Sequence, residues 1–263
     1  MMLANYHTHT SRCQHAVGQD RDYVEAALKA VYEILGFSDH SPWPFASGFV
    51  SSIRMRADQL DDYIRSVHDL QKAYEGVIRI HLGLEAEYFP RYHDWLERMR
   101  DRGVTYYILG QHYADSEEDT PYTGDECVTD EGVLRYAEST VKAIRTGLFA
   151  YLAHPDLFMR HRRPDQFNRA CEEASDMMVS ACLEQHIPIE YNLLGLHSEL
   201  DGNPRGYPSS PFWAYVNHHH CPVIIGVDAH NPDHLLQKRT REIAVKRLSS
   251  MDCEIVQTLP GLG

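Results

Sequence analysis

Short apolar segments alternate with longer amphipathic ones along the chain, and this alternation constrains the fold more than any other feature. The segments of strand length cover residues 3–6, 34–38, 77–88, 106–112, 149–154, 187–192 and 222–230. Each is followed by a segment with apolar residues at helical spacing; these cover residues 22–32, 57–75, 90–101, 130–146, 164–186, 209–219 and 236–250. Seven strand–helix units in a row predict a parallel sheet covered by helices.

A closed or nearly closed barrel is the simplest arrangement of so many parallel units. The chain has 263 residues, which is enough for one large α/β barrel or for two modest domains. No Ser- or Gly-rich linker divides it, so we expect residues 1–263 to form a single α/β domain with a parallel barrel. The stretch 193–208, LLGLHSELDGNPRGYP, is expected to be a loop.

Each expected strand ends in side chains that can bind a metal ion or form hydrogen bonds. In strand order these are His7 and His9, Asp39 and His40, Glu85 and Glu87, His112, His154 and Asp156, Asn192, and Asp228 and His230. The carboxyl ends of the strands in a parallel barrel share one face, where active sites of this architecture lie. Residues two apart on a strand point the same way, so we expect His7 and His9 to reach one ion together.

The chemistry of these side chains predicts a metal site. Imidazole and carboxylate groups together suit zinc, manganese or iron, whereas calcium prefers oxygen ligands alone. A single buried histidine such as His112 is usually a hydrogen-bonded core residue. Seven histidines at strand ends or in the first loop, together with Glu85 and Asp228, favour a shared site instead.

The remaining histidines and the cysteines are given structural interpretations. Four of the histidines are expected on helices or at the surface: His68, His93, His186 and His234. His81 lies too early on its strand to share the site, and the run His218, His219 and His220 is expected at the end of a helix. His161 and His197 stay open, because both are expected on loops near the active face. The six cysteines are scattered without a Cys-x-x-Cys pair and are interpreted as reduced thiols. Cys13 is a less favoured candidate ligand.

The charge and the apolar runs limit the classes of partner. The formal net charge of −13 disfavours nonspecific binding of nucleic acid or of an anionic membrane. No signal-peptide pattern opens the sequence, and no apolar run reaches the length of a membrane span. We therefore expect a cytoplasmic protein with no nucleic-acid or membrane partner; the sequence does not determine the oligomeric state.

Six motifs together resemble the polymerase-and-histidinol-phosphatase (PHP) family. They are HTHTSRCQHA, FSDHS, GLEAEY, GQHY, AHPD and GVDAH, in the family's order between residues 5 and 232. The chain length and the loop HPDLFMRHRRP are similar to those of the stand-alone histidinol-phosphate phosphatases. The resemblance implies a distorted (β/α)7 barrel with a trinuclear metal site at the carboxyl ends of the strands. The segment NLLGLHSELDGNPRG departs from the family pattern, which bears on substrate choice and not on the metal site.

The resemblance also implies a role for each ligand in binding three divalent transition-metal ions, which would be zinc, manganese or iron. One ion would be bound by His7, His9, Glu85 and Asp228; Glu85 would bridge to a second ion bound by His112 and His154; a third would take His15, His40 and His230. Asp39 would orient a ligand from behind.

The expected activity is hydrolysis of L-histidinol phosphate to L-histidinol and phosphate, a step of histidine biosynthesis. Bound metals lower the pKa of water from 15.7 towards roughly 7, so a metal-bridging hydroxide would attack phosphorus directly. Glu85 and Asp228 are the expected catalytic carboxylates, with Asp228 or a neighbouring histidine handling the proton. Arg160 is the favoured phosphate ligand, since a guanidinium matches phosphate geometry. The competing arginines are Arg12, Arg162, Arg163 and Arg205.

Other functions remain open at this point. A PHP phosphoesterase could act on nucleotides or on phosphotyrosine instead, although no basic domain is attached. The metal-dependent amidohydrolases also begin with His-x-His on a barrel, but they give no joint role to His15, His40 and a bridging Glu85. A metal-binding module without catalytic activity is the alternative that is not an enzyme.

Overall fold

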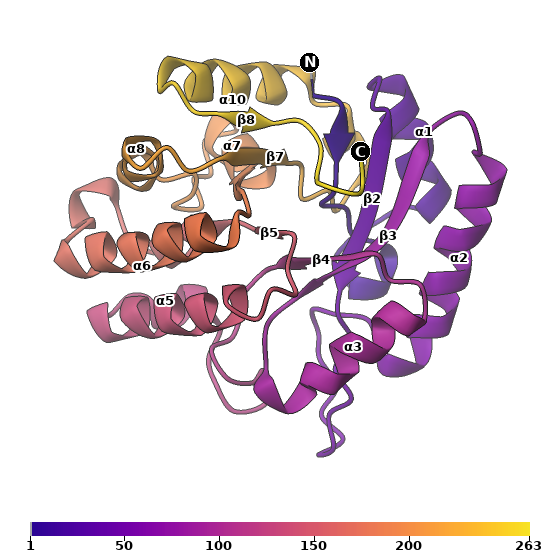
Figure 1. The fold of residues 1–263 in the computed structure, drawn as a ribbon, viewed down its shortest axis with the longest axis horizontal. Helices are drawn as coiled ribbons and strands as arrows, with labels where there is room; N and C mark the ends of the chain where they lie inside the picture. Colours follow the sequence, from indigo (N-terminus) through magenta and orange to yellow (C-terminus); the bar gives the residue numbers. More distant parts are fainter. Residues whose placement is uncertain (1) are drawn as a thin grey trace.

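The computed structural model describes residues 2–263, which form one sheet of parallel strands surrounded by helices (Figure 1). The strands follow each other in sequence order and are β1 (Ala4–Asn5), β2 (Ile34–His40), β3 (Arg79–Ala86), β4 (Tyr106–Leu109), β5 (Tyr151–Leu152), β6 (Ile189–Asn192), β7 (Val223–Gly226) and β8 (Ile255–Val256). The α/β architecture and the parallel sheet predicted from the alternating pattern are confirmed.

Helices connect the strands on the outside of the sheet. They are α1 (Asp20–Lys29), α2 (Leu60–Ala73), α3 (His93–Asp101), α4 (Thr123–Glu126), α5 (Asp130–Ile144), α6 (Arg169–Gln185), α7 (Leu193–Leu200), α8 (Ser210–His218), α9 (Pro232–Leu235) and α10 (Lys238–Ser250). Short 3-10 turns are η1 (Ser11–Cys13), η2 (Ala57–Gln59), η3 (Pro90–Tyr92), η4 (Pro155–Met159) and η5 (Pro164–Gln166). The apolar face of α2 shows why these segments are helical, because its buried residues recur at helical spacing; they are Leu60, Tyr63, Ile64, Val67 and Leu70.

The barrel closes at the carboxyl ends of its strands. Thr8, just after β1, forms a parallel bridge with Ala229, just after β7. The backbone N–H of His9 donates to the carbonyl of Ala229 at 2.9 Å, and the N–H of Ala229 donates to the carbonyl of His7 at 3.1 Å. At the amino ends β8 pairs with β7 instead, and the C-terminal segment lies against Tyr6, whose hydroxyl donates to Leu262. The barrel is therefore distorted, with β8 and the C-terminal residues between β7 and the start of β1.

Two parts of the sequence prediction need correction. The strand β8 was not predicted, because two residues at the edge of a sheet give no periodic signal. The expected loop 193–208 is wrong over its first half, where α7 forms. The Asn192 side chain caps this helix by accepting from the N–H of Gly195 at 2.9 Å, and Leu193 and Leu196 are buried. The expected helix end at His218 is confirmed.

Aromatic side chains fill the barrel interior below the carboxyl ends. The ring of Tyr106 covers Gly83, where an added β-carbon would lie 2.4 Å from the ring. Its single hydroxyl proton is shared between the carbonyl oxygens of Tyr6 and Phe37, at 2.8 and 3.0 Å from the hydroxyl oxygen. This packed layer gives the polar side chains above it a rigid floor. Within residues 2–263, no helix is both long and apolar enough to cross a membrane.

Candidate metal centre

Four side chains predicted to bind one ion converge at the barrel closure. His7 and His9 follow β1, Glu85 lies on β3 and Asp228 follows β7, and all four are buried. His7 Nε2 lies 3.5 Å from Glu85 Oε2 and 3.4 Å from Asp228 Oδ1. His9 Nε2 lies 3.4 Å and 3.2 Å from the same two oxygens.

These separations fit a bound cation better than a set of hydrogen bonds. Four nitrogen and oxygen ligands in a tetrahedron about zinc, at about 2.0–2.2 Å, lie about 3.3–3.6 Å from one another. His7 Nε2, His9 Nε2 and Glu85 Oε2 are all buried without a hydrogen-bond partner. Since nearly all buried polar atoms in native proteins are satisfied, this cluster has the donor atoms and the spacing to hold a divalent metal ion.

Glu85 presents its other oxygen to a second pair of histidines. Oε1 lies 2.8 Å from His154 Nε2 and 3.4 Å from His112 Nε2. One carboxylate thus faces two groups of imidazoles, as a bridging ligand would. His154 and Asp228 both have a positive φ, 29° and 54°. Such backbone strain in residues other than glycine gathers at functional sites.

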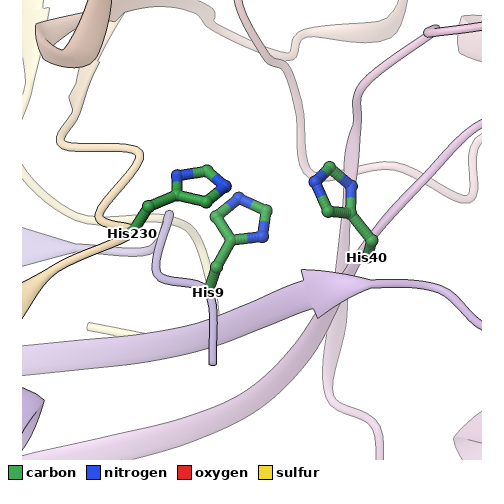
Figure 2. Close-up of side chains that lie close together, drawn as sticks. All are labelled: His9, His40 and His230. Atoms are coloured by element: carbon green, nitrogen blue, oxygen red, sulfur yellow. The ribbon is translucent and has the colours of Figure 1, made fainter. Parts of the chain in front are cut away.

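The third predicted group lies beside the first. His15 Nε2 and His230 Nε2 are 2.9 Å apart, and His40 Nδ1 lies 3.0 Å from Glu85 Oε2. Figure 2 shows His9, His40 and His230 pointing toward one another, and the ring centroids of His9 and His230 are 4.0 Å apart. His9 therefore borders both the first and third groups.

The nine predicted ligands thus lie in one region, but their division among ions stays a prediction. Within the described residues, several groups of His, Cys, Asp or Glu side chains lie close enough together to hold an ion. One of them is Cys13 with His15 and His230. The Cys13 thiol is fully buried, and burial raises its pKa.

A carboxylate stands behind each of three predicted ligand histidines. Glu190 Oε2 lies 2.7 Å from His7 Nδ1, Glu87 Oε1 lies 3.2 Å from His112 Nδ1, and Asp39 Oδ1 lies 3.5 Å from His9 Nδ1. Such partners fix the ring orientation and make the other nitrogen a better ligand. An orienting role was predicted for Asp39 alone.

Glu190 was missed, although the sequence contains a signal for it. It lies two residues before Asn192 on β6, so both side chains point to the same face of the strand. Asn192 Nδ2 donates to Glu190 Oε1 at 2.8 Å and to Asp228 Oδ2 at 3.0 Å. Glu190 and Asn192 therefore connect His7 to Asp228 through hydrogen bonds.

The acidic groups give one half of the cluster a strong attraction for protons or cations. Burial alone would lower the pKa of His9, but Asp228, Asp39 and Glu85 raise it to about 9. The opposite holds for His15, where burial and the neighbouring His230 and His9 lower the pKa to about 4. In the metal-free protein, His9 therefore holds a proton that a metal would displace, and His15 is already neutral.

A cavity of about 620 Å³ opens over the cluster. Seven of the nine predicted ligands line it, all except His7 and His9, and the rest of the lining comes from ten other residues. These other residues are Val17, Ile53, Tyr122, Leu157, Arg160, Leu194, Arg205, Tyr207, Asn231 and His234. The cavity is large enough for a small organic phosphate.

A family model described as "PHP domain" matches residues 5–192, more than half of the chain. The chain belongs to the PHP family. A Deinococcus radiodurans protein named "Probable histidinol-phosphatase" is 28% identical over 235 residues, covering 88% of this chain and 87% of its own. The Bacillus subtilis protein named "Histidinol-phosphatase" is 25% identical over 256 residues, covering 88% and 94%.

A solved structure supports the same fold. The histidinol phosphate phosphatase of Lactococcus lactis, crystallised with zinc, L-histidinol and phosphate, aligns with a TM-score of 0.73 at 16% identity. The alignment covers 97% of this chain and 95% of that protein. The distorted barrel expected from the PHP resemblance is therefore confirmed, and the amidohydrolase alternative is not supported.

Two of the five candidate arginines of this PHP chain line the cavity. Arg160 and Arg205 do so, and the Arg160 guanidinium carbon lies 5.5 Å from the centre of the Tyr122 ring. The other three are paired elsewhere. Arg12 bonds to Asp20 and Asp62, Arg162 is buried against the carbonyl of Cys127 and Asp130, and Arg163 pairs with Asp165 at the surface.

The histidines left outside the predicted site fall in several places. His234 lies on α9, as a helical interpretation requires, but it also lines the cavity, and its Nδ1 accepts from the backbone N–H of His230 at 3.3 Å. His197 lies on α7 beside His234, and exposed His161 pairs with Asp125. His81 lies beside Tyr6 in the lower barrel.

Proposed function

We propose that this PHP-family chain is a metal-dependent phosphomonoesterase that hydrolyses L-histidinol phosphate to L-histidinol and phosphate. We treat residues 1–263 as one metallophosphoesterase domain. The observation that carries the proposal is the convergence of nine imidazole and carboxylate side chains under a cavity that also holds Arg160 and Arg205. The names of the two curated relatives and the ligands of the Lactococcus lactis protein support this substrate.

The donor set fits three divalent ions in the predicted grouping. Three divalent ions would carry six positive charges, more than the carboxylates of Glu85 and Asp228 together with Asp39 and Glu190 behind the ligands can cancel, so the site would attract phosphate at close range despite the acidic surface. When bound, the ions would supply an activated water nucleophile and Lewis-acid contacts to the phosphate. Zinc, manganese and iron all suit this mixture of nitrogen and oxygen ligands.

The chain's own residues would hold the phosphate and manage the proton. The Arg160 backbone N–H donates to Leu157 at 3.0 Å, but among the described residues its side chain has no hydrogen-bond acceptor and only packs against Tyr122, so the guanidinium is free to bind phosphate oxygens. We assign Arg205 the second contact. Asp228 borders the cavity with Oδ1 3.3 Å from His230 Nδ1, which places a proton acceptor beside an imidazole. Asp228 would take the proton released by the attacking water and return a proton to the alkoxide of the leaving histidinol, with His230 beside it.

A hydrolysis panel with measured metal content tests this proposal. The panel contains histidinol phosphate, nucleotides, phosphotyrosine and a generic aryl phosphate. Two additional hydrogen bonds to the amine and imidazole, at about 1 kcal/mol each, would favour histidinol phosphate over the aryl ester by about thirtyfold. Preference for a nucleotide or phosphotyrosine would contradict the substrate. A metal-loaded protein inert on every ester would indicate a binding module.

A further inference from the structure

The segment of residues 41–56, between β2 and η2, has no regular secondary structure and passes beside the cavity; we call residues 43–53 of it the wall. Ile53 lines the cavity from this segment. Surface segments of this kind are usually mobile. Here Arg54 anchors the segment, with a side chain only 1% exposed, among groups that the proposed mechanism does not otherwise use.

The Arg54 guanidinium joins three separate loops. Nη2 and Nη1 donate to Glu87 Oε1 and Oε2 at 2.8 and 3.1 Å, and Nη1 also donates to the carbonyl of Ser41 at 3.0 Å. Nε donates to Glu117 Oε2 at 2.6 Å, and the Ser51 hydroxyl donates to Glu117 Oε1 at 2.6 Å. Burying these three charges is costly and gives little net stability, so the network more readily serves to fix one geometry.

Glu87 connects this network to a predicted metal ligand. Its Oε1 accepts from Arg54 and lies 3.2 Å from His112 Nδ1, while its Oε2 accepts from Trp43 Nε1 at 3.0 Å. With Nδ1–H donating to the carboxylate, His112 keeps the lone pair of Nε2, which faces Glu85 Oε1 at 3.4 Å. Residues of the wall on both sides of Ile53 therefore hold the carboxylate that orients His112.

A second connection leads to the loop after β1. Gln14 Nε2 donates to the carbonyl oxygens of Ser51 and Arg54, both at 2.8 Å. Gln14 directly precedes His15, another predicted ligand. The segment is therefore hydrogen-bonded next to two predicted ligands. Arg54 bonds to Glu87, which contacts His112, and Gln14, which precedes His15, donates to Ser51 and Arg54.

We propose that Arg54 and Glu87 are positioning residues that couple metal binding at His112 to the placement of the cavity wall 43–53. A ligand role for His112 would fix its ring, and the ring would fix Glu87, which in turn bonds to Arg54 and Trp43. Coupling of this kind is reciprocal, so an ordered wall also strengthens metal binding at His112. The inference rests on the proposed function only in taking His112 as a ligand.

Zinc titration combined with hydrogen exchange tests the coupling without any substrate. Zinc affinity is measured by competition with a chelator, and the step that belongs to His112 is the one lost in His112→Ala. Amide exchange is followed in the peptide covering residues 43–53 at each stage. In the wild-type protein, protection of this peptide is expected to rise as the His112 step fills.

Two matched carboxylate variants separate the roles. Glu87→Gln is expected to weaken the His112 zinc step by about 10- to 100-fold and to abolish its effect on exchange. Glu117 contacts Arg54 and Ser51 but not His112, so Glu117→Gln should loosen the wall and, because it reaches His112 only through Arg54 and Glu87, weaken the His112 zinc step much less than Glu87→Gln does. If Glu87→Gln does not fold, Arg54→Lys replaces it; the loss of the bidentate fork should uncouple the wall from zinc in the same way.

The outcomes decide the proposal separately from the enzymatic assignment. Wild-type zinc affinity in Glu87→Gln, or wild-type exchange that does not respond to zinc, would overturn the coupling. So would equal losses of zinc affinity in Glu87→Gln and Glu117→Gln, which indicate general destabilisation. A protein that shows the coupling but does not hydrolyse histidinol phosphate would contradict the proposed function alone.

Discussion

Replacing Arg160 by alanine should impair phosphate binding without affecting the metals. The aliphatic part of the side chain packs on α4, where a β-carbon at Gly124 would lie 2.5 Å from Arg160 Cδ, and the guanidinium faces Tyr122. This packing aims a cation into the cavity that has no acceptor among the described residues. A hydrogen bond to a charged group is worth about 1.5–3 kcal/mol, so kcat/KM should fall by about 10- to 150-fold.

Steady-state kinetics with histidinol phosphate and an aryl phosphate provide the assay. Both substrates should lose similar factors in Arg160→Ala, because both present the same phosphate. Arg163→Ala is the matched control, since that exposed arginine lies on the same loop and pairs with Asp165. Metal content should stay at the wild-type value. Loss of metal in Arg160→Ala would make the residue structural, and unchanged kinetics would transfer the phosphate contact to Arg205.

Four further predictions concern the metal cluster and the reaction. Metal analysis of active protein should give three ions per chain, and Glu85→Gln should lower both metal content and activity more than loss of a ligand that serves one ion; a ceiling of one ion would contradict this. Zinc binding near pH 7 should release protons, because the pKa of His9 is raised to about 9 in the metal-free protein, and apparent affinity should rise with pH up to about 9. The same raised pKa stabilises the metal-free fold below about pH 6.5, and this contribution is lost as the pH rises towards 9, which urea unfolding at several pH values would detect. Hydrolysis in heavy-oxygen water should label the phosphate and leave the histidinol unlabelled; trapping a phosphorylated side chain would refute direct attack.

Sequence periodicity predicted most of the fold because strands and helices of a barrel bury regular faces. The prediction failed where contacts between parts of the chain that are distant in sequence decide the local structure. The two residues of β8 have no pattern of their own and pair with β7 only once the barrel exists. Over residues 193–200, Gly195 and several polar residues suggested a loop, whereas the Asn192 cap and the burial of Leu196 favour a helix.

The candidate site could be predicted to a similar degree. The rule that parallel strands end on one face was enough to expect the nine ligands together, because they lie at strand ends or in the first loop. The rule could not identify Arg54, which lies on an irregular segment and acts through Glu87. It also could not divide the ligands among ions, because His9 lies between two groups in a way that depends on side-chain rotation.

The partial closure of the barrel has a direct consequence for the metal cluster. Ala229 stands between Asp228 and His230, and its two backbone hydrogen bonds go to the carbonyl of His7 and the N–H of His9. The same bonds that close the barrel therefore set four predicted ligands in register. No such requirement applies at the amino ends, where the C-terminal segment fills the gap beside β1. Closure at the carboxyl end is the closure that matters for the cluster, because the residues that follow β1 and β7 must lie within the few ångströms that a shared metal ion would demand.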